Sequence, residues 1–169
     1  MQILETDRLF LRQLTLDDTD DLYEILSDPE AMRYYPAPFT REQTIGWIDW
    51  NLRNYAQYRF GLWAVVHKDD GLVLGDCGLT IQPVEGRLEV EIGYHLKRAV
   101  WGNGYATEAA LACRDYAFTM VKAPRVVSIV HPQNMPSRRV AARVHTTLRE
   151  FLWEKTQSTM CLYSTEGHG

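Results

Sequence analysis

Two glycines, Gly102 and Gly104, lie between a strand-like run and a helix-like run in the stretch "HLKRAVWGNGYATEAALAC", residues 95–113. A helix that begins directly after them presents unpaired backbone N–H groups and the positive end of its dipole at one point. Glycine also tolerates left-handed backbone angles and lets an anion approach the main chain, because it has no Cβ. The pattern indicates a pyrophosphate-binding loop, and a plain strand-to-helix turn is the alternative that the same residues permit.

Two common phosphate-binding motifs do not fit this loop. A Walker loop needs a lysine after its last glycine, whereas Tyr105 follows Gly104. A dinucleotide fingerprint needs a third glycine near position 107, where Thr107 stands. The preceding strands also indicate a meander rather than the parallel βαβ units of a dinucleotide-binding domain. The loop is therefore expected to bind a phosphate-bearing ligand of another kind.

The elements that would position this loop predict an α+β domain. Thr40 and Gln43 form a capping box before a long helix, and tight turns at Asp70-Gly71 and Glu85-Gly86 separate three strands. We expect a central mixed, mostly antiparallel sheet of about seven strands flanked by about four helices. The expected elements are a strand at 8–14, helices at 15–28 and 40–57, strands at 60–68, 72–82 and 88–96, a helix at 105–121, a strand from 125, a helix at 136–145 and a hairpin at 148–164.

Composition bounds the class of protein. A chain of 169 residues is the length of one domain, so residues 1–169 are expected to share one core. The apolar runs are too short to span a bilayer, and the charged residues from Glu5 onward do not resemble a signal peptide, which favours the cytoplasm. The net charge of -4 argues against bulk nucleic-acid binding. Cys77, Cys113 and Cys161 are widely spaced, so neither a disulfide framework nor a metal site is expected.

Three segments together resemble one known family. They are "LETDRLFLRQLTLDDTDDLYEILSDPEAMRYY", "VEIGYHLKRAVWGNGYATEA" and "HPQNMPSRRVAARV". In this order they are similar to the opening, the fourth strand with its acetyl-CoA loop, and the second cofactor motif of the GCN5-related N-acetyltransferases (GNAT), in particular the branch of ribosomal-protein N-terminal (RimJ/RimL-like) acetyltransferases. The resemblance covers essentially the whole chain. It implies a GNAT-like fold and acetyl-CoA as cosubstrate, without a metal.

The resemblance also implies which residues hold acetyl-CoA. The amides from Gly102 to Thr107 would bind the pyrophosphate, Asn134 would bond to the pantetheine arm, and a splayed fourth strand with a bulge at Gly93 would supply an oxyanion donor. The expected cofactor-binding residues are Ile92, Gly93, Tyr94, Trp101, Gly102, Asn103, Gly104, Tyr105, Ala106, Thr107, Asn134, Ser137 and Arg139.

Structural roles are the alternative for several of these residues. Trp101 could pack its indole on the sheet, Asn134 could end a strand, and Ser137 could cap a helix after Pro136. Arg139 shares a helix face with the nearby Arg143, where the pair either meets the CoA phosphates or forms a solvated face.

The chemistry of acetyl transfer needs a base, because an amine attacks a thioester only when neutral and an alkylamine with a pKa of about 10 is mostly protonated at pH 7. Strand alternation puts Glu91 on the same side as Glu89 and His95, and Glu91 is the expected catalytic base. A solvated charge or a structural ion pair is the alternative for Glu91. The resemblance places Ser137 near the departing sulfur, and Tyr94 and Tyr105 are the alternatives. No acyl-enzyme is required, because proximity can supply much of the rate.

One departure from the family pattern affects the acceptor side. The branch usually has a glycine turn where this chain has His145, so either His145 adopts a left-handed conformation or the turn is rebuilt. His145 itself is expected to be structural or on the surface. Aromatic residues between 34 and 58 either wall an amine site or pack in the core; they are Tyr34, Tyr35, Trp47, Trp50, Tyr55 and Tyr58.

The expected function is acetyl transfer from acetyl-CoA to a primary amine, by direct attack in a ternary complex. The acceptor could be a peptide N-terminus, a polyamine or an amino-sugar. Two other classes stay open: a catalytically silent acyl-CoA-binding or regulatory module, and a structural or nucleotide-binding domain whose glycine loop is only a turn. The final hairpin leaves a sheet edge exposed, so a monomer or a homodimer is expected.

Overall fold

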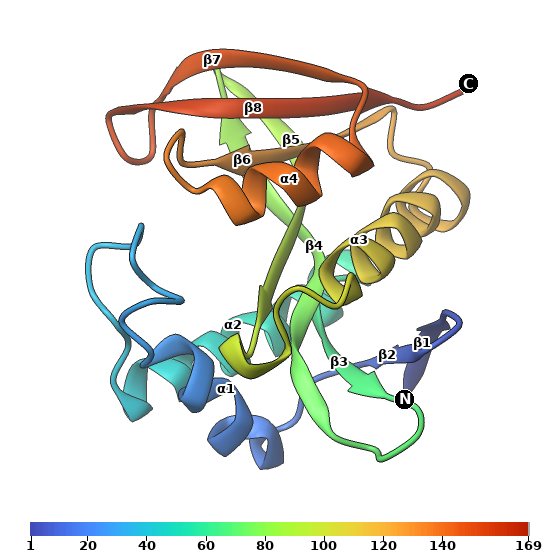
Figure 1. Cartoon of the computed structure of the whole chain (residues 1–169). Helices are drawn as coiled ribbons and strands as arrows, with labels where there is room; N and C mark the ends of the chain where they lie inside the picture. Colours follow the sequence, from blue (N-terminus) through green and yellow to red (C-terminus); the bar gives the residue numbers. More distant parts are fainter. Residues whose placement is uncertain (169) are drawn as a thin grey trace.

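The computed structural model describes residues 1–168 as an eight-stranded sheet with helices on both faces (Figure 1). Its strand order is β1-β2-β3-β4-β5-β6-β8-β7. Among the described strands, β5 and β6 pair in parallel, and every other neighbouring pair is antiparallel. The strands are β1 (Gln2–Glu5), β2 (Leu9–Arg12), β3 (Leu62–His67), β4 (Val73–Val84), β5 (Arg87–Leu96), β6 (Arg125–Val130), β7 (Thr147–Trp153) and β8 (Ser158–Glu166). The α+β architecture with a mixed, mostly antiparallel sheet is confirmed.

The sheet has one strand more than the sequence predicts. The additional strand is β1, which pairs with β2 at the edge of the sheet. It is four residues long and its burial pattern does not alternate, so it carries little of the period-two signal that identifies a strand.

Within residues 1–168, four α-helices flank the sheet: α1 (Thr19–Leu26), α2 (Arg41–Tyr58), α3 (Tyr105–Tyr116) and α4 (Met135–Val144). The predicted capping box of α2 is present, because the Thr40 side chain accepts from Gln43 N and the Gln43 side chain accepts from Thr40 N. A short π-helical segment, Ala117–Val121, extends α3. The turn predicted at Glu85-Gly86 has positive φ at both residues, as a tight hairpin turn requires.

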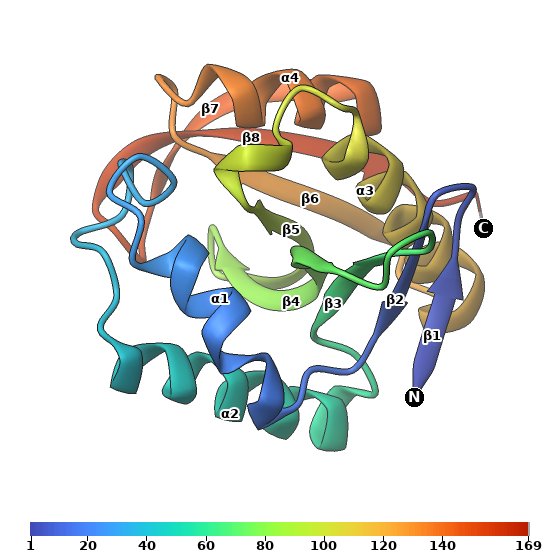
Figure 2. The same cartoon turned by 60° about the horizontal axis from the view of Figure 1, so that its bottom comes forward.

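The helices lie in two layers, with α1 and α2 on one face of the sheet and α3 and α4 on the other (Figure 2). Alternate residues of β3 serve the two cores: Val65 belongs to the cluster that includes α3 residues, while Ala64 and Val66 belong to the cluster that includes α1 and α2 residues. On β5, Ile92 packs in the α3 cluster with Tyr94 against it. Glu91 and His95, at the alternate positions, therefore lie on the α1 and α2 side of the sheet.

Candidate active site

Strands β5 and β6 separate part of the way along their length. Their parallel pairing joins Val90 to Val126 and Glu91 to Val127, and it does not continue beyond these residues. Pairing of β5 with β4 runs through Gly93 without a change of register, so the predicted bulge at Gly93 is wrong for this ladder. The backbone of β5 is therefore parted from β6 by divergence of the two strands and not by an extra residue.

Side chains bridge the two strands where their backbone pairing stops. The Glu91 carboxylate accepts a hydrogen bond from the backbone N–H of Ile129, with a distance of 2.8 Å from Oε2 to N. In the other direction, the hydroxyl of Ser128 donates to the carbonyl of Ile92 at 2.9 Å. Buried backbone groups need such partners, so these bonds let the strands diverge without leaving those groups unpaired.

Glu91 is partly buried, and its environment brings its ionisation close to neutrality. Burial raises the pKa of Glu91 to about 7, although the N–H of Ile129 and the charge of Lys155 act in the opposite direction. A carboxyl group with a pKa near the working pH can both accept and release a proton, as a general base must. The position and pKa of Glu91 are thus compatible with its predicted role.

The glycine loop has the backbone conformation that the sequence predicts. Gly102 and Gly104 have φ angles of 82° and 80°, both in the left-handed region. A Cβ built on Gly102 meets nothing within 4 Å, so glycine is needed there for its backbone angle and not for space. Gly104 is the N-cap of α3, and its carbonyl accepts from Glu108 N at 3.0 Å. The exposed loop therefore leads directly into the positive end of a helix dipole.

Two polar side chains shape this loop. The Trp101 indole is 41% exposed and donates through Nε1 to the carbonyl of Leu96 at 2.9 Å, so it does not pack into the core. The Asn103 amide donates to the carbonyl of Val100 at 2.9 Å. Trp101 therefore holds the loop to the end of β5, and Asn103 holds it to the short 3-10 turn at Arg98–Val100.

Arg8, which was not among the predicted site residues, adds a positive charge at the same loop. Its guanidinium lies 2.7 Å from the Glu108 carboxylate and 4.3 Å from the centroid of the Tyr105 ring. Arg8 Nη2 also lies 3.4 Å from the position of a Cβ built on Gly104. Arg8 and Glu108 are 100 residues apart in sequence, so no local pattern predicts their contact. The pair connects the start of β2 to the first turn of α3.

Tyr94 and Ser137 meet on the α3 and α4 side of β5. The Tyr94 hydroxyl donates to the Ser137 carbonyl at 2.8 Å, and the Ser137 hydroxyl donates to the Tyr94 oxygen at 3.1 Å. Burial raises the pKa of Tyr94 above its ordinary value, so its hydroxyl stays protonated at neutral pH. Asn134 is the N-cap of α4 and accepts from Ser137 N at 3.3 Å. The cap of α4 is therefore Asn134 and not Ser137, which was the expected alternative for the cap, and the Asn134 amide nitrogen is not used in it.

A network of four side chains lies on the opposite face of β4 and β5. Asp76 on β4 is fully buried, and its carboxylate accepts from Trp47 Nε1 at 2.9 Å. The other Asp76 oxygen lies 2.8 Å from His95 Nδ1, and His95 Nε2 lies 2.6 Å from the Tyr35 hydroxyl. Trp47 and Tyr35 come from α2 and from the segment before it, so their approach to β5 could not be predicted from the sequence.

A glycine in β4 allows this network to form. A Cβ built on Gly75 would lie 2.0 Å from the carbonyl oxygen of His95, closer than any real side chain tolerates. Glycine therefore lets β4 approach β5 closely beside the pair of Asp76 and His95. Burial lowers the pKa of the His95 imidazole, but the Tyr35 hydroxyl and the Asp76 carboxylate act more strongly and hold that pKa well above its ordinary value.

The segment between α1 and α2 crosses from β5 to β6. Tyr35 contacts His95 on β5, while the neighbouring Tyr34 donates to the carbonyl of Gln133 at 2.9 Å and stacks on the His131 ring at 4.7 Å. His131 and Gln133 follow β6 directly. The two tyrosines therefore connect the diverging strands on the α1 and α2 side of the sheet.

The other aromatic residues between 34 and 58 are divided between the two expected roles. Tyr55 is buried in the core and is bonded to the backbone of Leu14 and Leu62, so it cannot line an amine site. Tyr58 stacks on Phe60, away from His95. Trp47 contacts both the His95 ring and the Trp50 ring. Of this set, Tyr34, Tyr35 and Trp47 are the residues that meet the elements of the candidate site.

In the turn after α4, His145 does not adopt a left-handed conformation. The second expectation, a turn with a different backbone geometry, is the one that the structure shows. The His145 φ and ψ angles of −109° and 163° are extended. The buried ring bonds to the Ser128 hydroxyl at 2.8 Å and to the Thr165 hydroxyl at 3.0 Å. Burial lowers the pKa of His145 to about 4. His145 is thus a neutral structural residue between β6 and β8.

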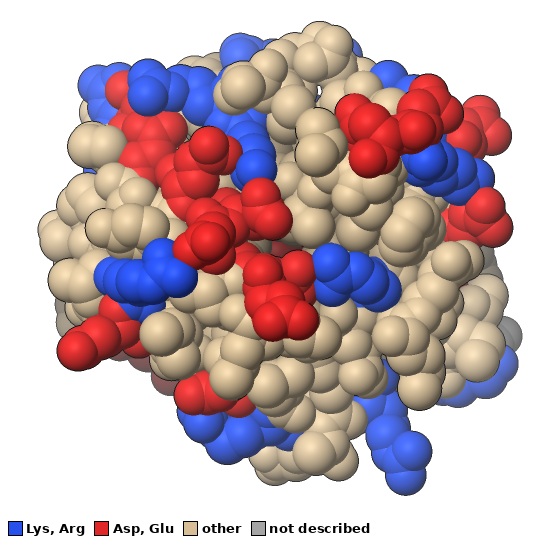
Figure 3. Space-filling view, turned by 90° about the horizontal axis from the view of Figure 1, so that it is seen from below, with Lys and Arg blue, Asp and Glu red and all other residues tan. Residues whose placement is uncertain are grey.

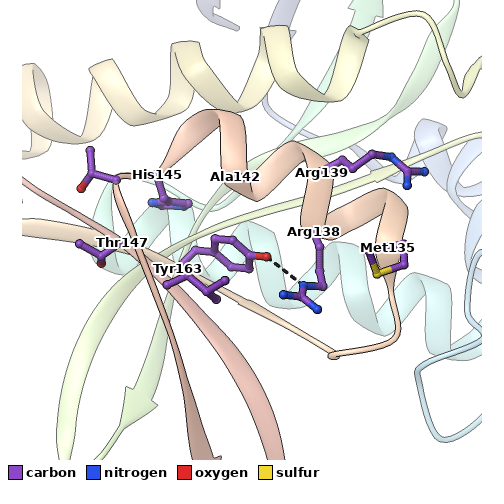
Figure 4. Close-up of a pocket in the computed structure, with 9 residues that line it drawn as sticks. Met135, Arg138, Arg139, Ala142, His145, Thr147 and Tyr163 are labelled. Carbon is purple, nitrogen blue, oxygen red and sulfur yellow. Dashed lines mark hydrogen bonds between the residues drawn. The ribbon is translucent and has the colours of Figure 1, made fainter.

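A pocket of about 420 Å³ lies on the β7 and β8 side of α4 (Figure 4). Arg138 donates from Nε to the Tyr163 hydroxyl at 3.0 Å, while Ser137 faces Tyr94 on β5. Arg139 is exposed and points away from Tyr163. The pocket therefore lies apart from the contact between Ser137 and Tyr94. Its lining residues are Met135, Arg138, Arg139, Ala142, His145, Thr146, Thr147, Leu148 and Tyr163.

Acidic side chains gather on the face that is seen from below (Figure 3). On this side α1 carries Asp20, Asp21 and Glu24, and each of them lies within 4 Å of a basic group. Lys97 at the end of β5 lies 2.8 Å from Asp21 and 3.2 Å from Glu24. The two pairs with Lys97 join α1 to the end of β5, and the pair of Asp20 with Arg41 joins α1 to the start of α2.

Residues 1–168 contain neither a membrane-spanning helix nor a cluster of metal ligands. No helix among them is both long and apolar enough to cross a membrane. In the same residues, no group of three or more His, Cys, Asp or Glu side chains is placed to hold a metal ion.

Comparisons with known proteins identify the family. Residues 8–147 match the family model of the acetyltransferase (GNAT) domain. The chain is 38% identical over 144 residues to the uncharacterized N-acetyltransferase p20 of Bacillus licheniformis, covering 81% of this chain and 78% of that protein.

Solved structures show the same fold. The crystal structure of an acetyltransferase from Agrobacterium tumefaciens has a TM-score of 0.83 and 29% identity, covering 96% of this chain and 93% of that one. RimL, a ribosomal L7/L12 α-N-protein acetyltransferase solved in complex with coenzyme A, has a TM-score of 0.77 at 17% identity, with coverage of 99% and 98%. The protein therefore belongs to the GNAT family of acetyltransferases, which use acetyl-CoA.

Proposed function

We propose that this protein is an N-acetyltransferase that transfers the acetyl group of acetyl-CoA to a primary amine by direct attack in a ternary complex. The observation that carries the proposal is the position of Glu91. Its carboxyl group, with a pKa of about 7, lies where β5 and β6 stop pairing. The acceptor is a peptide N-terminus or a small amine such as a polyamine or an amino-sugar.

The cosubstrate lies along the cofactor-binding residues of the loop and of β5. Amides from Gly102 to Thr107 bind its pyrophosphate, supported by the α3 dipole and by Arg8. Trp101 and Asn103 hold the loop in shape, and Tyr105 and Ala106 belong to the first turn of α3. The amide of Asn134 bonds to the pantetheine arm, and exposed Arg139 pairs with a phosphate of CoA.

Residues on the two faces of β5 take part in different steps of the reaction. Backbone N–H groups from Ile92 to Tyr94 stabilise the negative charge that develops on the thioester oxygen. Glu91 takes the proton that the amine loses as its nitrogen bonds to the acetyl carbon. The C–S bond breaks, and the departing thiolate takes a proton through the Ser137 hydroxyl, which is itself bonded to Tyr94.

Binding and turnover test this proposal separately. Isothermal titration with acetyl-CoA, ATP and NAD is expected to give saturable, micromolar binding of acetyl-CoA alone, and Gly104→Asp is expected to abolish it. Thiol release is then measured with a panel of primary amines, for the wild type and for Glu91→Gln. Binding without any amine-dependent thiol release would identify a silent acyl-CoA-binding module, and an absence of binding would reduce the glycine loop to a turn.

A further inference from the structure

Glu108 is an acidic residue beside a loop that is proposed to bind an anion. It lies in the first turn of α3, which begins directly after Gly104. Residues 99–107, which include the whole loop, carry no charged side chain. A carboxylate at this position occupies the positive end of the helix dipole and repels a second anion there. The charge of Glu108 therefore opposes the binding of pyrophosphate unless another group compensates it.

The Glu108 carboxylate is held by the chain around the start of β2. Its Oε2 atom accepts from the Thr6 hydroxyl at 2.5 Å and from the backbone N–H of Arg8 at 3.0 Å, and its Oε1 atom accepts from Arg8 Nε at 2.7 Å. Burial acts to raise the pKa of Glu108, but the hydrogen bonds from Thr6 and Arg8 outweigh it and lower that pKa. Glu108 is thus an anion at neutral pH, and these bonds fix its position.

The Arg8 guanidinium extends from this carboxylate to the glycine loop. Its Nε donates to Glu108, and its central carbon lies 4.3 Å from the centroid of the Tyr105 ring. Its Nη2 lies 3.4 Å from the position of a Cβ built on Gly104. Within residues 1–168, Glu108 supplies the only carboxylate that lies within 4 Å of this guanidinium. The positive charge of Arg8 therefore lies beside both the carboxylate and the loop.

We propose that Arg8 is a charge-compensating residue, which neutralises Glu108 so that the loop can hold the anionic pyrophosphate of acetyl-CoA. This inference rests on the proposed function and assigns to Arg8 an electrostatic part in selecting a phosphate-bearing donor. Arg8 acts through Glu108, so it is a positioning residue and not a catalytic one. The pair brings no net charge to the loop, whereas Glu108 without Arg8 leaves a carboxylate at the end of α3 that the phosphates approach.

A structural pair and a compensating pair predict opposite effects of losing the Glu108 charge. The bonds of Glu108 join the start of β2 to α3, so a purely structural role predicts that their loss loosens the loop and weakens binding. Compensation predicts instead that removal of the carboxylate frees the Arg8 charge for the loop and keeps or tightens binding. Glu108→Gln retains a side-chain oxygen that accepts hydrogen bonds, so the variant changes mainly the charge.

The test measures the binding of acetyl-CoA by isothermal titration. Arg8→Gln removes the compensating charge, Glu108→Gln removes the negative charge, and the double variant removes both. Arg8→Lys keeps a positive charge without the guanidinium fork. Arg149→Gln is the matched control, because Arg149 pairs with Glu85 at the surface and lies on β7, at the opposite edge of the sheet from β1 and β2. Thermal unfolding shows whether each variant is folded.

Compensation predicts that Arg8→Gln raises the Kd for acetyl-CoA about 10-fold at about 50 mM salt, as expected for charges that interact near a protein surface. Glu108→Gln should bind at least as tightly as the wild type, and the double variant should return to within about 3-fold of it. Arg8→Lys should bind more tightly than Arg8→Gln, and Arg149→Gln should bind like the wild type. The defect of Arg8→Gln should shrink at about 500 mM salt, because salt screens exposed charges.

Three outcomes would overturn the compensation. If Glu108→Gln binds as weakly as Arg8→Gln, the pair is structural. If the double variant is as weak as Arg8→Gln, Arg8 bonds directly to a phosphate, and unchanged binding in Arg8→Gln would leave Arg8 without a part in binding. The sign of the Glu108→Gln effect decides the question even if Arg8→Gln does not fold.

A failure of the proposed function gives a different result. If the wild type itself does not bind acetyl-CoA, the glycine loop is not a cosubstrate site and the proposed function fails with it. If the wild type binds acetyl-CoA and the variants do not follow the predicted order, the compensation alone is wrong.

Discussion

The carboxylate of Glu91 on β5 accepts a hydrogen bond from the backbone N–H of Ile129 on β6, across the point where the two parallel strands separate. A side chain thus replaces a ladder bond between the strands. Since the same carboxyl group has a pKa raised to about 7, one residue both supports the divergence of the strands and can exchange a proton there.

Replacing Glu91 by glutamine should remove the base but keep the acceptor for Ile129 N–H. We expect kcat/KM to fall about 100-fold or more, because general-base catalysis contributes about 10²- to 10⁴-fold. The wild-type rate should rise with pH through about 7 as the carboxylate forms, and the variant should lose this rise. Glu89→Gln, on the same face of β5 and paired with Arg125, is the matched control that should keep the pH profile.

The same pKa predicts how stability depends on pH. The pKa of Glu91 in the folded protein is raised to about 7 from 4.5, so its contribution is fully present below 4.5 and is lost as the pH rises through 7. The shift corresponds to about 3 kcal/mol at most. Urea unfolding at several pH values should show this loss in the wild type and not in Glu91→Gln. Identical pH dependence in both proteins would contradict the assignment.

His145 should have the opposite effect. Its pKa is lowered to about 4 from 6.5, so the stability it contributes is present above 6.5 and is lost as the pH falls towards 4. At pH 5 the loss should be about 2 kcal/mol relative to pH 7. Unfolding free energies of the wild type and of His145→Gln, measured at both values, should differ in their pH dependence by this amount, and equal slopes would refute the prediction.

The glycine loop can be tested against a turn with the same backbone conformation. Gly102 and Gly86 have φ angles of 82° and 79°, and a Cβ on either would meet nothing within 4 Å. Alanine at each position should therefore cost a similar stability of about 1 kcal/mol or more from backbone strain. Calorimetric titration should find weaker acetyl-CoA binding only for Gly102→Ala. Equal affinities in the two variants would show that the loop does not bind the cosubstrate.

Tyr94 and Ser137 should act together on the departing thiolate. Because the two hydroxyls are hydrogen-bonded to each other, Tyr94→Phe and Ser137→Ala should each lower kcat, and the double variant should lose less than the product of the two effects. A thioester with a more acidic thiol leaves more easily, so the defects should become smaller with such a donor. If the loss of kcat in the double variant equals the product of the two single losses, Tyr94 and Ser137 do not act together.

The elements with a strong local pattern could be predicted from the sequence. The capping box of Thr40 and Gln43 and the positive φ angles of Gly102 and Gly104 follow from local residue types, and the structure contains both. The alternation of β5 also placed Glu91 and His95 correctly on one face. Among the described strands, β1 alone was not predicted, because a four-residue edge strand carries little periodicity.

The parts of the site that were missed depend on contacts between distant segments. Arg8 meets Glu108 across 100 residues, and Tyr35 meets His95 across 60. In the sequence, Asp76 is a single charged residue in an otherwise apolar strand. Its hydrogen-bond partners come from α2 and β5, so the local pattern does not indicate them. The bulge predicted at Gly93 was wrong for a related reason. Strands β5 and β6 separate because their backbone groups bond to other partners, and β5 contains no inserted residue where it pairs with β4.

The most direct test of the account is the initial rate of thiol release with acetyl-CoA and a primary alkylamine both varied. Direct attack in a ternary complex predicts that release requires the amine and that double-reciprocal lines intersect. Parallel lines would indicate an acyl-enzyme and contradict direct attack. No amine-dependent release, in a protein that binds acetyl-CoA, would contradict acetyl transfer itself.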